Sequence, residues 1–517
     1  MKERLFASKQ EAEKFLKQQF GEGEAFDVVF KSIYIRQMPV LICYISGLVQ
    51  NESITVMLAN LQKELVVEKG ERANEKKEEQ GNQDNQDRSK EKPDIGDPKL
   101  LSNEAEDPLY FQAHFNYHGI DDVKTRDDFL LGILSGRVGF VTVDGFAYLA
   151  EFRNYPGRNP EEPDNEKVIR GSRDGFSENI IINAALIRRR IRSPELRMNL
   201  QQVTNIGKTD VAVVYMNDLV NEEHLNFVKK RFSEIEHDGL TMADKSLEEW
   251  LFKQKYHPLP FVRYSERPDI VAAHLLEGHI AIVVDTSPSV MLLPTTAFQL
   301  LMHAEEYRQA PLIGTVMRLL RYVAVLMSLL LIPLWYLFAT QVELLPEALK
   351  FIGVEEKSEV PLYLQLLVAD VGIEFLRMAA IHTPTPLSTA MGLIAGVLIG
   401  QIAIDVGLFS GEAVLYTAIV ALFSFAIPNY ELGVSVKIFR HLLLAMTALF
   451  GLNGLFIGAF LLLTYIASLK PMNIPYLWPL MPFFPKAFIR VLVRFPMTSD
   501  ALRPYVTGAK ERSRADQ

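Results

Sequence analysis

The segment VAVVYMNDLVNEEHLNFVKKRF, residues 211–232, decides how the first part of the chain folds. It opens with an apolar run typical of a buried strand, passes a polar turn and continues with apolar residues at helical spacing. The segment VLICYISGLVQNESITVMLANL, residues 40–61, repeats this order. In both segments the apolar run contains a tyrosine, Tyr44 and Tyr215, followed by Leu-Val and a polar cap. The pair indicates two copies of one strand–helix unit.

A second pair of segments extends the repeat. ILSGRVGFVTVDGFAYLAEF and LLEGHIAIVVDTSPSVMLLP each contain a glycine, an apolar run, an Asp-centred turn and a second apolar run. Their glycines, Gly136 and Gly278, are 142 residues apart, whereas the two tyrosines are 171 apart. Residues 68–95 explain the difference, because they are too polar to bury the surface that ordering requires and are predicted to be a disordered insertion in the first copy. The alternative is a chance similarity of two strand–helix units.

Charged residues become rare in the second half of the chain. Only 18 of the 161 residues from Ala310 to Lys470 are Asp, Glu, Lys or Arg. We therefore predict an α+β membrane protein, in which tandem α/β subdomains precede a transmembrane bundle of four to six helices. The predicted parts are a first subdomain 1–170, a second subdomain 171–309, a transmembrane domain 310–470 and a basic amphipathic tail 471–517.

The whole-chain composition excludes several classes of function. The net charge of −9 argues against nucleic acid as a partner. A single cysteine, Cys43, excludes an intrachain disulfide. The N-terminal sequence MKERLFASKQ has no apolar core of the kind found in cleaved signals. We expect the subdomains before the first membrane span to be cytoplasmic.

Five segments are long enough to cross a bilayer. Four are clear spans with the approximate bounds Val316–Phe338, Leu387–Leu408, Ala413–Pro428 with its flanks and His441–Leu469. The basic-residue bias places Arg318 and Arg321, at the N-terminal end of the first span, on the cytoplasmic side. Five crossings would then leave the basic tail outside, against the same bias. The sequence offers a re-entrant segment or a membrane dip near Tyr476 as solutions and does not choose between them.

The fifth segment, Pro361–Ala380, carries three charges, Asp370, Glu374 and Arg377. Charges inside a membrane helix are costly and therefore indicate function or pairing. The spacing places the three on one face and allows Glu374 to pair with Arg377 within the helix. Two interpretations stay open: an ion pathway that favours cations, or an ion pair that latches helices together.

Further residues suit a helical assembly. Candidates for helix packing or gating are Gly392, Gly396, Gly400, Pro428, Asn429 and Asn453. Structural packing explains any one of them, and together with the charged helix they favour a channel or transporter subunit.

A basic cluster ends the predicted helix that runs to Ile191, for which Ser177 or Asp174 could be the cap. The cluster consists of Arg188, Arg189, Arg190 and Arg192. It suits an assembly contact with lipid phosphates or an acidic neighbouring subunit. Alternatively, the arginines only compensate the helix dipole.

The sequence contains three partial matches to catalytic or ligand-binding motifs, and each lacks a residue that its motif requires. NIGKTD, residues 205–210, lacks the upstream glycine of a phosphate-binding loop. His274 and His279 have the wrong offset for metal ligands on one helical face, and Ser287 lacks a nucleophile elbow. We predict a protein that is not an enzyme, with no cofactor and no metal.

Several long blocks carry a resemblance to a known family. RGSRDGFSENIIINAALIRRRIRSPELR at 170–197, RYSERPDIVAAHLLEGHIAIVVDTSPSVMLLPTT at 263–296 and FAIPNYELGVSVKIFRH at 425–441 resemble the GerA family of spore germination A-subunits. The stretch 373–409 looks most like one branch of that family. The resemblance covers nearly the whole chain outside 69–93.

The resemblance implies a multi-pass protein of the spore inner membrane that oligomerises into a ring of about five subunits and conducts cations during germination. Membrane lipid and other germination membrane proteins are the partners it implies. The branch that 373–409 resembles would amplify or relay germination rather than sense a nutrient. A non-conducting scaffold and a solute transporter remain the alternatives, although no inverted repeat of the transporter kind is visible.

Overall fold

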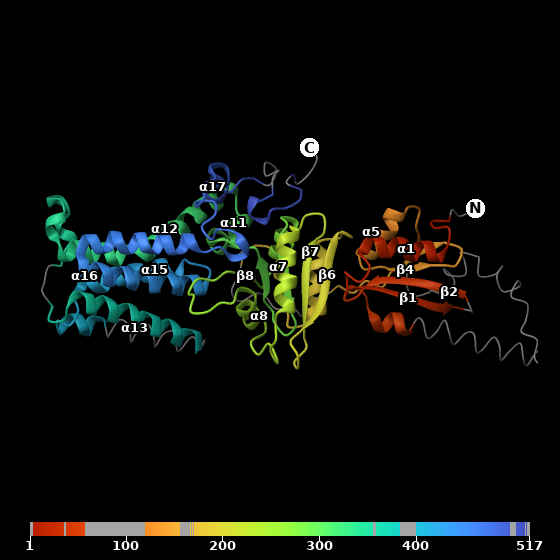
Figure 1. The fold of residues 1–517 in the computed structure, drawn as a ribbon, viewed down its shortest axis with the longest axis horizontal. Coiled ribbons are helices and arrows are strands. Elements are labelled where there is room, and N and C mark those ends of the chain that lie inside the picture. Colours follow the sequence, from red (N-terminus) through yellow and green to blue (C-terminus); the bar gives the residue numbers. More distant parts are fainter. Residues whose placement is uncertain are drawn as a thin grey trace, which may run out of the picture.

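The computed structural model describes residues 4–35, 38–56, 119–155, 166, 168, 170–354, 358–382, 400–496, 503–511 and 513. Three bodies follow one another along its long axis: a sheet subdomain near the N-terminus, a second sheet subdomain, and a bundle of helices (Figure 1). The predicted insertion 68–95 lies outside the described residues. The mixed α/β character predicted from the sequence is confirmed.

Both subdomains contain a five-stranded sheet in which neighbouring strands are antiparallel. In order across the first sheet, the strands are β1 (Val28–Ile35), β2 (Met38–Ile45), β4 (Val138–Val141), β5 (Ala147–Ala150) and β3 (Ile120–Asp122). Across the second they are β6 (Leu196–Val203), β7 (Thr209–Met216), β9 (Ile280–Val284), β10 (Val290–Leu293) and β8 (Arg263–Ser265). The two orders are the same when the strands are matched in sequence.

Helices cover the sheets because each sheet has apolar faces to bury. One face of the first sheet packs against α1 (Lys9–Phe20) and α5 (Arg126–Leu134). The second sheet is covered on one face by α6 (Ile180–Arg190) and α9 (Pro268–Leu276), and on the other by α7 (Glu222–Ser233) and α8 (Ala243–Phe252).

The repeated glycines have a structural reason. Gly136 follows the end of α5 with φ +86°, and Gly278 follows α9 with φ +90°. A residue with positive φ at a helix end is most often glycine, because a side chain is strained there. Each glycine turns the chain from a helix into the central hairpin of its sheet.

The start of α6 differs from the prediction. Its cap is Asn179, whose side chain accepts from the backbone N–H groups of Ile181 at 2.9 Å and Ile182 at 3.2 Å. Ser177 instead bonds Asn183, and Asp174 pairs with Arg190. Asn179 is the N-cap, and Ser177 and Asp174 are not, because Asn179 lies directly before the first helical residue.

In the described part of the chain, the bundle contains four long helices. They are α12 (Pro311–Thr340), α13 (Leu362–His382), α15 (Gly411–Phe425) and α16 (Tyr430–Ser468), and short helices α10 (Ala297–Leu300) and α11 (Ala304–Arg308) lead into α12. Among the described residues, α12 and α16 are long and apolar enough to cross a membrane, and α15 is a shorter apolar helix. Most of the predicted span Leu387–Leu408 lies outside the described residues.

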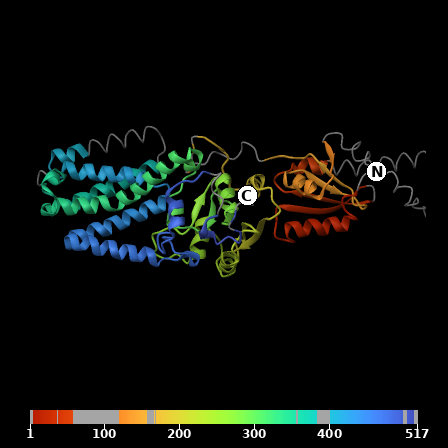
Figure 2. The same ribbon diagram turned by 90° about the horizontal axis from the view of Figure 1, so that it is seen from above.

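The last helix of the bundle reverses direction. Gly451 has φ +57° and ψ −137°, which is not helical. The rings of Phe439 and Tyr465 lie 6.1 Å apart, although 26 residues of straight helix would separate them by about 39 Å. A Cβ on Gly454 would lie 1.9 Å from the Met446 carbonyl oxygen. The two arms of α16 therefore lie side by side (Figure 2).

This reversal corrects the predicted single span His441–Leu469. Both ends of α16 lie at the second subdomain: Ser435 bonds the Pro258 carbonyl, and the Tyr476 carbonyl accepts from Ala297. The tail continues along the same subdomain, where Lys510 pairs with Glu222 at 2.8 Å. Within it, α17 (Pro485–Leu492) packs beside the start of α12.

Replacing Gly451 with alanine should destabilise the bundle. The new Cβ would lie 2.4 Å from Nε2 of Gln341, and the backbone conformation costs a side chain roughly 1–3 kcal/mol. Thermal unfolding of the purified protein in detergent measures the loss. The matched control is Gly433→Ala in the same helix, where the added Cβ meets nothing within 4 Å. Equal stability of the two variants would contradict the reversal.

Candidate functional site

The centre of the bundle holds a buried ion pair between two helices. Asp370 of α13 accepts from Nη2 of Arg440 of α16 at 2.5 Å, and both side chains are almost inaccessible to solvent. Nε2 of His441 lies 2.9 Å from the same carboxylate oxygen. In a low-dielectric interior each charge is costly alone, so the pair fixes α13 against α16.

Arg440 also connects the other two helices. Its Nη1 donates to the Ser328 carbonyl of α12 at 2.8 Å, and the hydroxyls of Ser328 and Ser424 of α15 are 2.9 Å apart. Thus one guanidinium links all four long helices at about half the length of α12. We call Asp370, Arg440, His441, Ser328 and Ser424 the central polar cluster.

A second ion pair lies nearer the bundle surface. Glu374 of α13 contacts Lys437 of α16 and not Arg377, so the predicted pair within the helix is wrong. Both side chains line a cavity of about 220 Å³ between the two helices, together with apolar residues that include Phe375 and Met378. Lys437 is the partner of Glu374 because it reaches the carboxylate from α16, across the cavity between the two helices.

Arg377 makes a different contact. Its guanidinium lies over the rings of Phe425 at 5.5 Å and Tyr430 at 4.7 Å. Such cation–π contacts favour a cation on an aromatic face. The three charges of α13 therefore have three different environments.

The remaining bundle candidates have varied positions. Asn429 caps α16 by accepting from the Leu432 N–H at 2.8 Å, and Pro428 precedes it in the turn after α15. Asn453 is exposed beside the reversal at Gly451. A Cβ on Gly400 would meet nothing within 4 Å, and Gly392 and Gly396 lie outside the described residues. Among the described residues of the bundle, Gly454 and Gly458 permit close contact between the two arms of α16, and the sequence analysis missed both.

The basic cluster of α6 is mostly engaged within the chain. Arg188 is fully buried and donates to both carboxylate oxygens of Asp27, at 2.7 and 3.0 Å. Arg190 pairs with Asp174 at 2.6 Å, and Arg189 lies over the Tyr155 ring. Arg192 is exposed. The predicted lipid or subunit contact of Arg188 is therefore wrong, because Asp27 of the first subdomain already neutralises it.

Arg188→Gln should destabilise the protein by about 3–5 kcal/mol, because it leaves Asp27 buried without its partner. The control Arg192→Gln removes an exposed arginine and should cost at most about 0.5 kcal/mol. Denaturant unfolding of the full chain in detergent compares them. Equal unfolding midpoints would show that the Asp27 contact contributes nothing.

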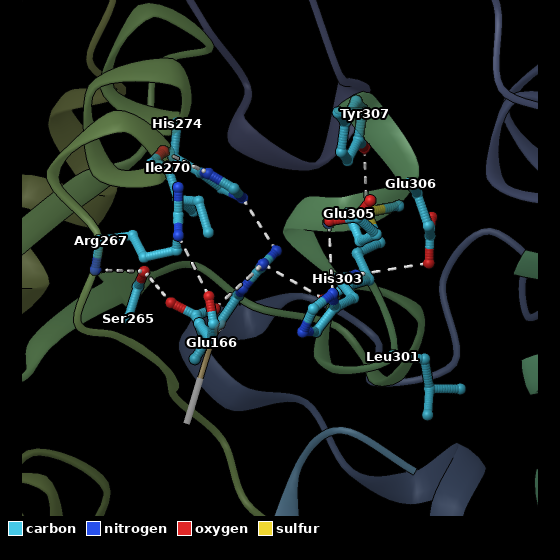
Figure 3. Close-up of polar contacts among 12 residues, drawn as sticks. Glu166, Ser265, Arg267, Ile270, His274, Leu301, His303, Glu305, Glu306 and Tyr307 are labelled. Carbon is cyan, nitrogen blue, oxygen red and sulfur yellow. Dashed lines mark hydrogen bonds and ion pairs between the residues drawn. The ribbon is translucent and has the colours of Figure 1, made fainter. Parts of the chain in front are cut away.

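The second subdomain is joined to the bundle by buried charges. Glu306 of α11 is fully buried and contacts Arg318, at 2.8 Å from its Nε, and Arg321 of α12. Nearby, Arg263 of β8 reaches Nε2 of His274 at 3.2 Å and the Met302 carbonyl at 3.3 Å. Figure 3 shows Glu166 facing Ser265 on one side of this junction, with His274 of α9 above it, and His303 and Glu306 at the start of α11 on the other side.

The buried surroundings of this junction lower the pKa values of its histidines and so favour their neutral form. Burial, with Arg321 and Arg263 nearby, lowers the pKa of His303 to about 4. Burial also lowers the pKa of His279 to about 3. His274 and His279 do touch, with ring centroids 4.9 Å apart, and no cluster of three or more metal-ligating side chains occurs among the described residues. The junction is thus a buried polar contact between the second subdomain and α12.

Other rejected motifs are placed as follows. Residues 205–208 form the turn between β6 and β7, and a strand follows where a phosphate-binding loop needs a helix. Ser287 bonds the Ser289 backbone in the turn between β9 and β10.

Arg440→Gln should lower stability by about 3–5 kcal/mol, because it leaves Asp370 buried and unpaired. The double variant Asp370→Asn, Arg440→Gln should recover part of this loss, since neither charge remains. Arg377→Gln, the same change without a described ion pair, is the control and should have a smaller effect. Thermal unfolding in detergent compares these three variants and the single variant Asp370→Asn. Additive losses in the double variant would exclude a direct pair.

The protein has two parts. The head consists of the two sheet subdomains, which a buried arginine joins, and the base is a bundle of apolar helices with ion pairs between them, as in membrane proteins. The chain belongs to the GerA family: the model of the Bacillus/Clostridium GerA spore germination protein matches residues 14–506. It is therefore a protein of spore germination.

Individual relatives agree with this family. The chain is 45% identical to stage V sporulation protein AF of Bacillus subtilis (strain 168) over 99% of this chain and 97% of that protein. This confirms the assignment to one branch of the family, that of stage V sporulation protein AF, which the stretch 373–409 predicted. It is 29% identical to spore germination protein KA of the same organism, over 77% of this chain and 73% of that protein. Neither relative is named as an enzyme.

A solved structure also matches. The crystal structure of the N-terminal domain of the A subunit of the Bacillus megaterium spore germinant receptor GerK3 has 22% identity and a TM-score of 0.37. The match covers 56% of this chain and 96% of that chain.

Proposed function

We propose that the protein is an oligomeric, multi-pass subunit of the spore inner membrane that conducts cations and so releases ions or amplifies the germination signal. The observation that carries this proposal is the Glu374–Lys437 pair beside a cavity on an otherwise apolar helical surface. Ionisable residues at membrane depth are expensive and are kept where they act.

Connectivity supports six crossings. The helices α12, α13, α15 and the two arms of α16 give five passes. Gln365, early in α13, bonds the Ser410 N–H just before α15, so both helices start at the same end of the bundle. The predicted span Leu387–Leu408, most of which lies outside the described residues, would bring the proposed number of crossings to six. Six crossings return the basic tail to the side of Arg318 and Arg321, which the bias of basic residues places in the cytoplasm.

The interior of one subunit suits packing rather than conduction. Asp370 is neutralised by Arg440, and Asp370, Arg440, Ser328 and Ser424 of the central polar cluster are buried among the four helices. A conduction path would therefore form between subunits, with Glu374 facing it, and this requires a ring of several copies. The family resemblance suggests five.

Gating would begin in the head. A movement of β8 or α9 reaches α12 through Arg263, Met302 and the Glu306–Arg318 pair. Membrane lipid and other germination membrane proteins are the proposed partners. The fully paired Asp370 also fits the alternative of a non-conducting scaffold, because it stabilises the bundle without exposing a charge.

Potassium efflux from liposomes containing the full-length protein separates these functions. Glu374→Gln should reduce efflux about tenfold, because a carboxylate about 10 Å from a cation contributes roughly 1.7 kcal/mol at an effective dielectric constant of about 20. Lys437→Gln should increase efflux, because it frees Glu374. The control Glu343→Gln removes an exposed carboxylate beyond the end of α12 and should change nothing. No efflux at all would favour the scaffold, whereas efflux that none of the variants changes would contradict a conduction path at Glu374.

A further inference from the structure

An apolar surface lies beside the start of α12 on the side of the second subdomain. Its members are exposed, with fractions from 48% for Val316 to 76% for Leu312. We call it the collar surface: Leu312, Ile313 and Val316 of α12, and Phe483, Phe484 and Ile489 in and before α17.

Contacts with α12 hold the two parts of the collar surface together. The Val491 carbonyl accepts from Nη1 of Arg318 at 3.2 Å and from the Tyr322 hydroxyl at 3.0 Å. The Arg494 N–H donates to the Thr315 hydroxyl at 3.1 Å. Ala487 and Val491 face inward, so α17 presents its other apolar side outward.

The collar surface lies beyond the hydrocarbon layer. A helix of 30 residues is about 45 Å long, whereas the hydrocarbon core is about 30 Å thick. Counted back from Thr340, the core ends near Leu320, and burying all of α12 would need a tilt of about 48°, outside the usual range of about 0–40°. Val316 therefore falls at headgroup level, about 6 Å beyond the core, and Leu312 and Ile313 lie at the outer edge of that layer, about 10–12 Å along the helix axis from Leu320.

The charge of the adjoining segment points to one occupant. Residues 470–496 contain four cations, Lys470, Lys486, Arg490 and Arg494, and no acidic residue. Lys470 and Lys486 are exposed. Cations near an anionic lipid surface contribute about 1 kcal/mol each, and phenylalanine beside them suits an interfacial helix. The surface is also continuous with the exposed apolar side chains of Leu319 and Leu320 farther along α12.

From this position, charge and continuity, we propose that the collar surface is a lipid-binding site, in which α17 lies on the cytoplasmic headgroup layer of an anionic membrane. It would fix the height of the second subdomain above the bilayer. The proposal rests on the proposed membrane placement of the bundle.

Depth-dependent quenching in vesicles of phosphatidylcholine and phosphatidylglycerol tests this inference. The full chain with Cys43→Ser carries one cysteine-linked fluorophore, placed by Phe484→Cys, Leu326→Cys or Ile206→Cys. Leu326 is exposed near the middle of α12, and Ile206 is exposed on the β6–β7 turn of the head. At position 484, a nitroxide at the lipid headgroup should quench about twofold more than one at mid-chain. The order should reverse at 326, and 206 should not be quenched.

Three outcomes would overturn the proposal. Quenching at 326 but not at 484 removes the lipid site alone. Self-quenching between copies at 484, without lipid quenching, assigns the surface to a second copy of the chain. No quenching at 326 removes the membrane placement and this inference with it. As a further check, Phe483→Ser with Ile489→Ser should reduce headgroup quenching at 484 about twofold.

Discussion

The buried pair of Asp370 and Arg440 is the constraint around which the bundle is arranged. A carboxylate and a guanidinium this deep among apolar helices are tolerated only together, and the guanidinium has further donors that need acceptors. Ser328 supplies two of these acceptors and brings α12 and α15 into the same network. One charged side chain therefore takes part in a polar network that reaches all four long helices.

The same constraint explains why the proposed ion path involves the Glu374–Lys437 pair and not Asp370. Because Asp370 is neutralised inside the subunit, it cannot attract an ion without the bundle opening. Glu374 lies one turn away at a cavity, where a neighbouring copy or an ion could reach it. The second subdomain contacts this bundle through Glu306, which pairs with Arg318 and Arg321 of α12.

Local features of the fold were readable from the sequence, and partners distant in the chain were not. Gly136 and Gly278 could be recognised because a helix end with positive φ favours glycine in each copy. Charges in α13 stood out against their apolar surroundings, but their partners in α16 did not, since spacing reports only neighbours on one helix. Likewise Asp27 is 161 residues from Arg188. Gly451 gave no signal, because a single glycine in an apolar helix is common.

The side of the membrane reached by each end of α16 tests the account most directly. In the Cys43→Ser background, single cysteines at Ile206, Asn453 and Lys470 can be labelled from one side of sealed membranes with an impermeant reagent. All three positions are exposed. The reversal at Gly451 predicts that 206 and 470 react from the same side and 453 from the opposite side. Labelling of 470 from the side opposite to 206 would contradict it.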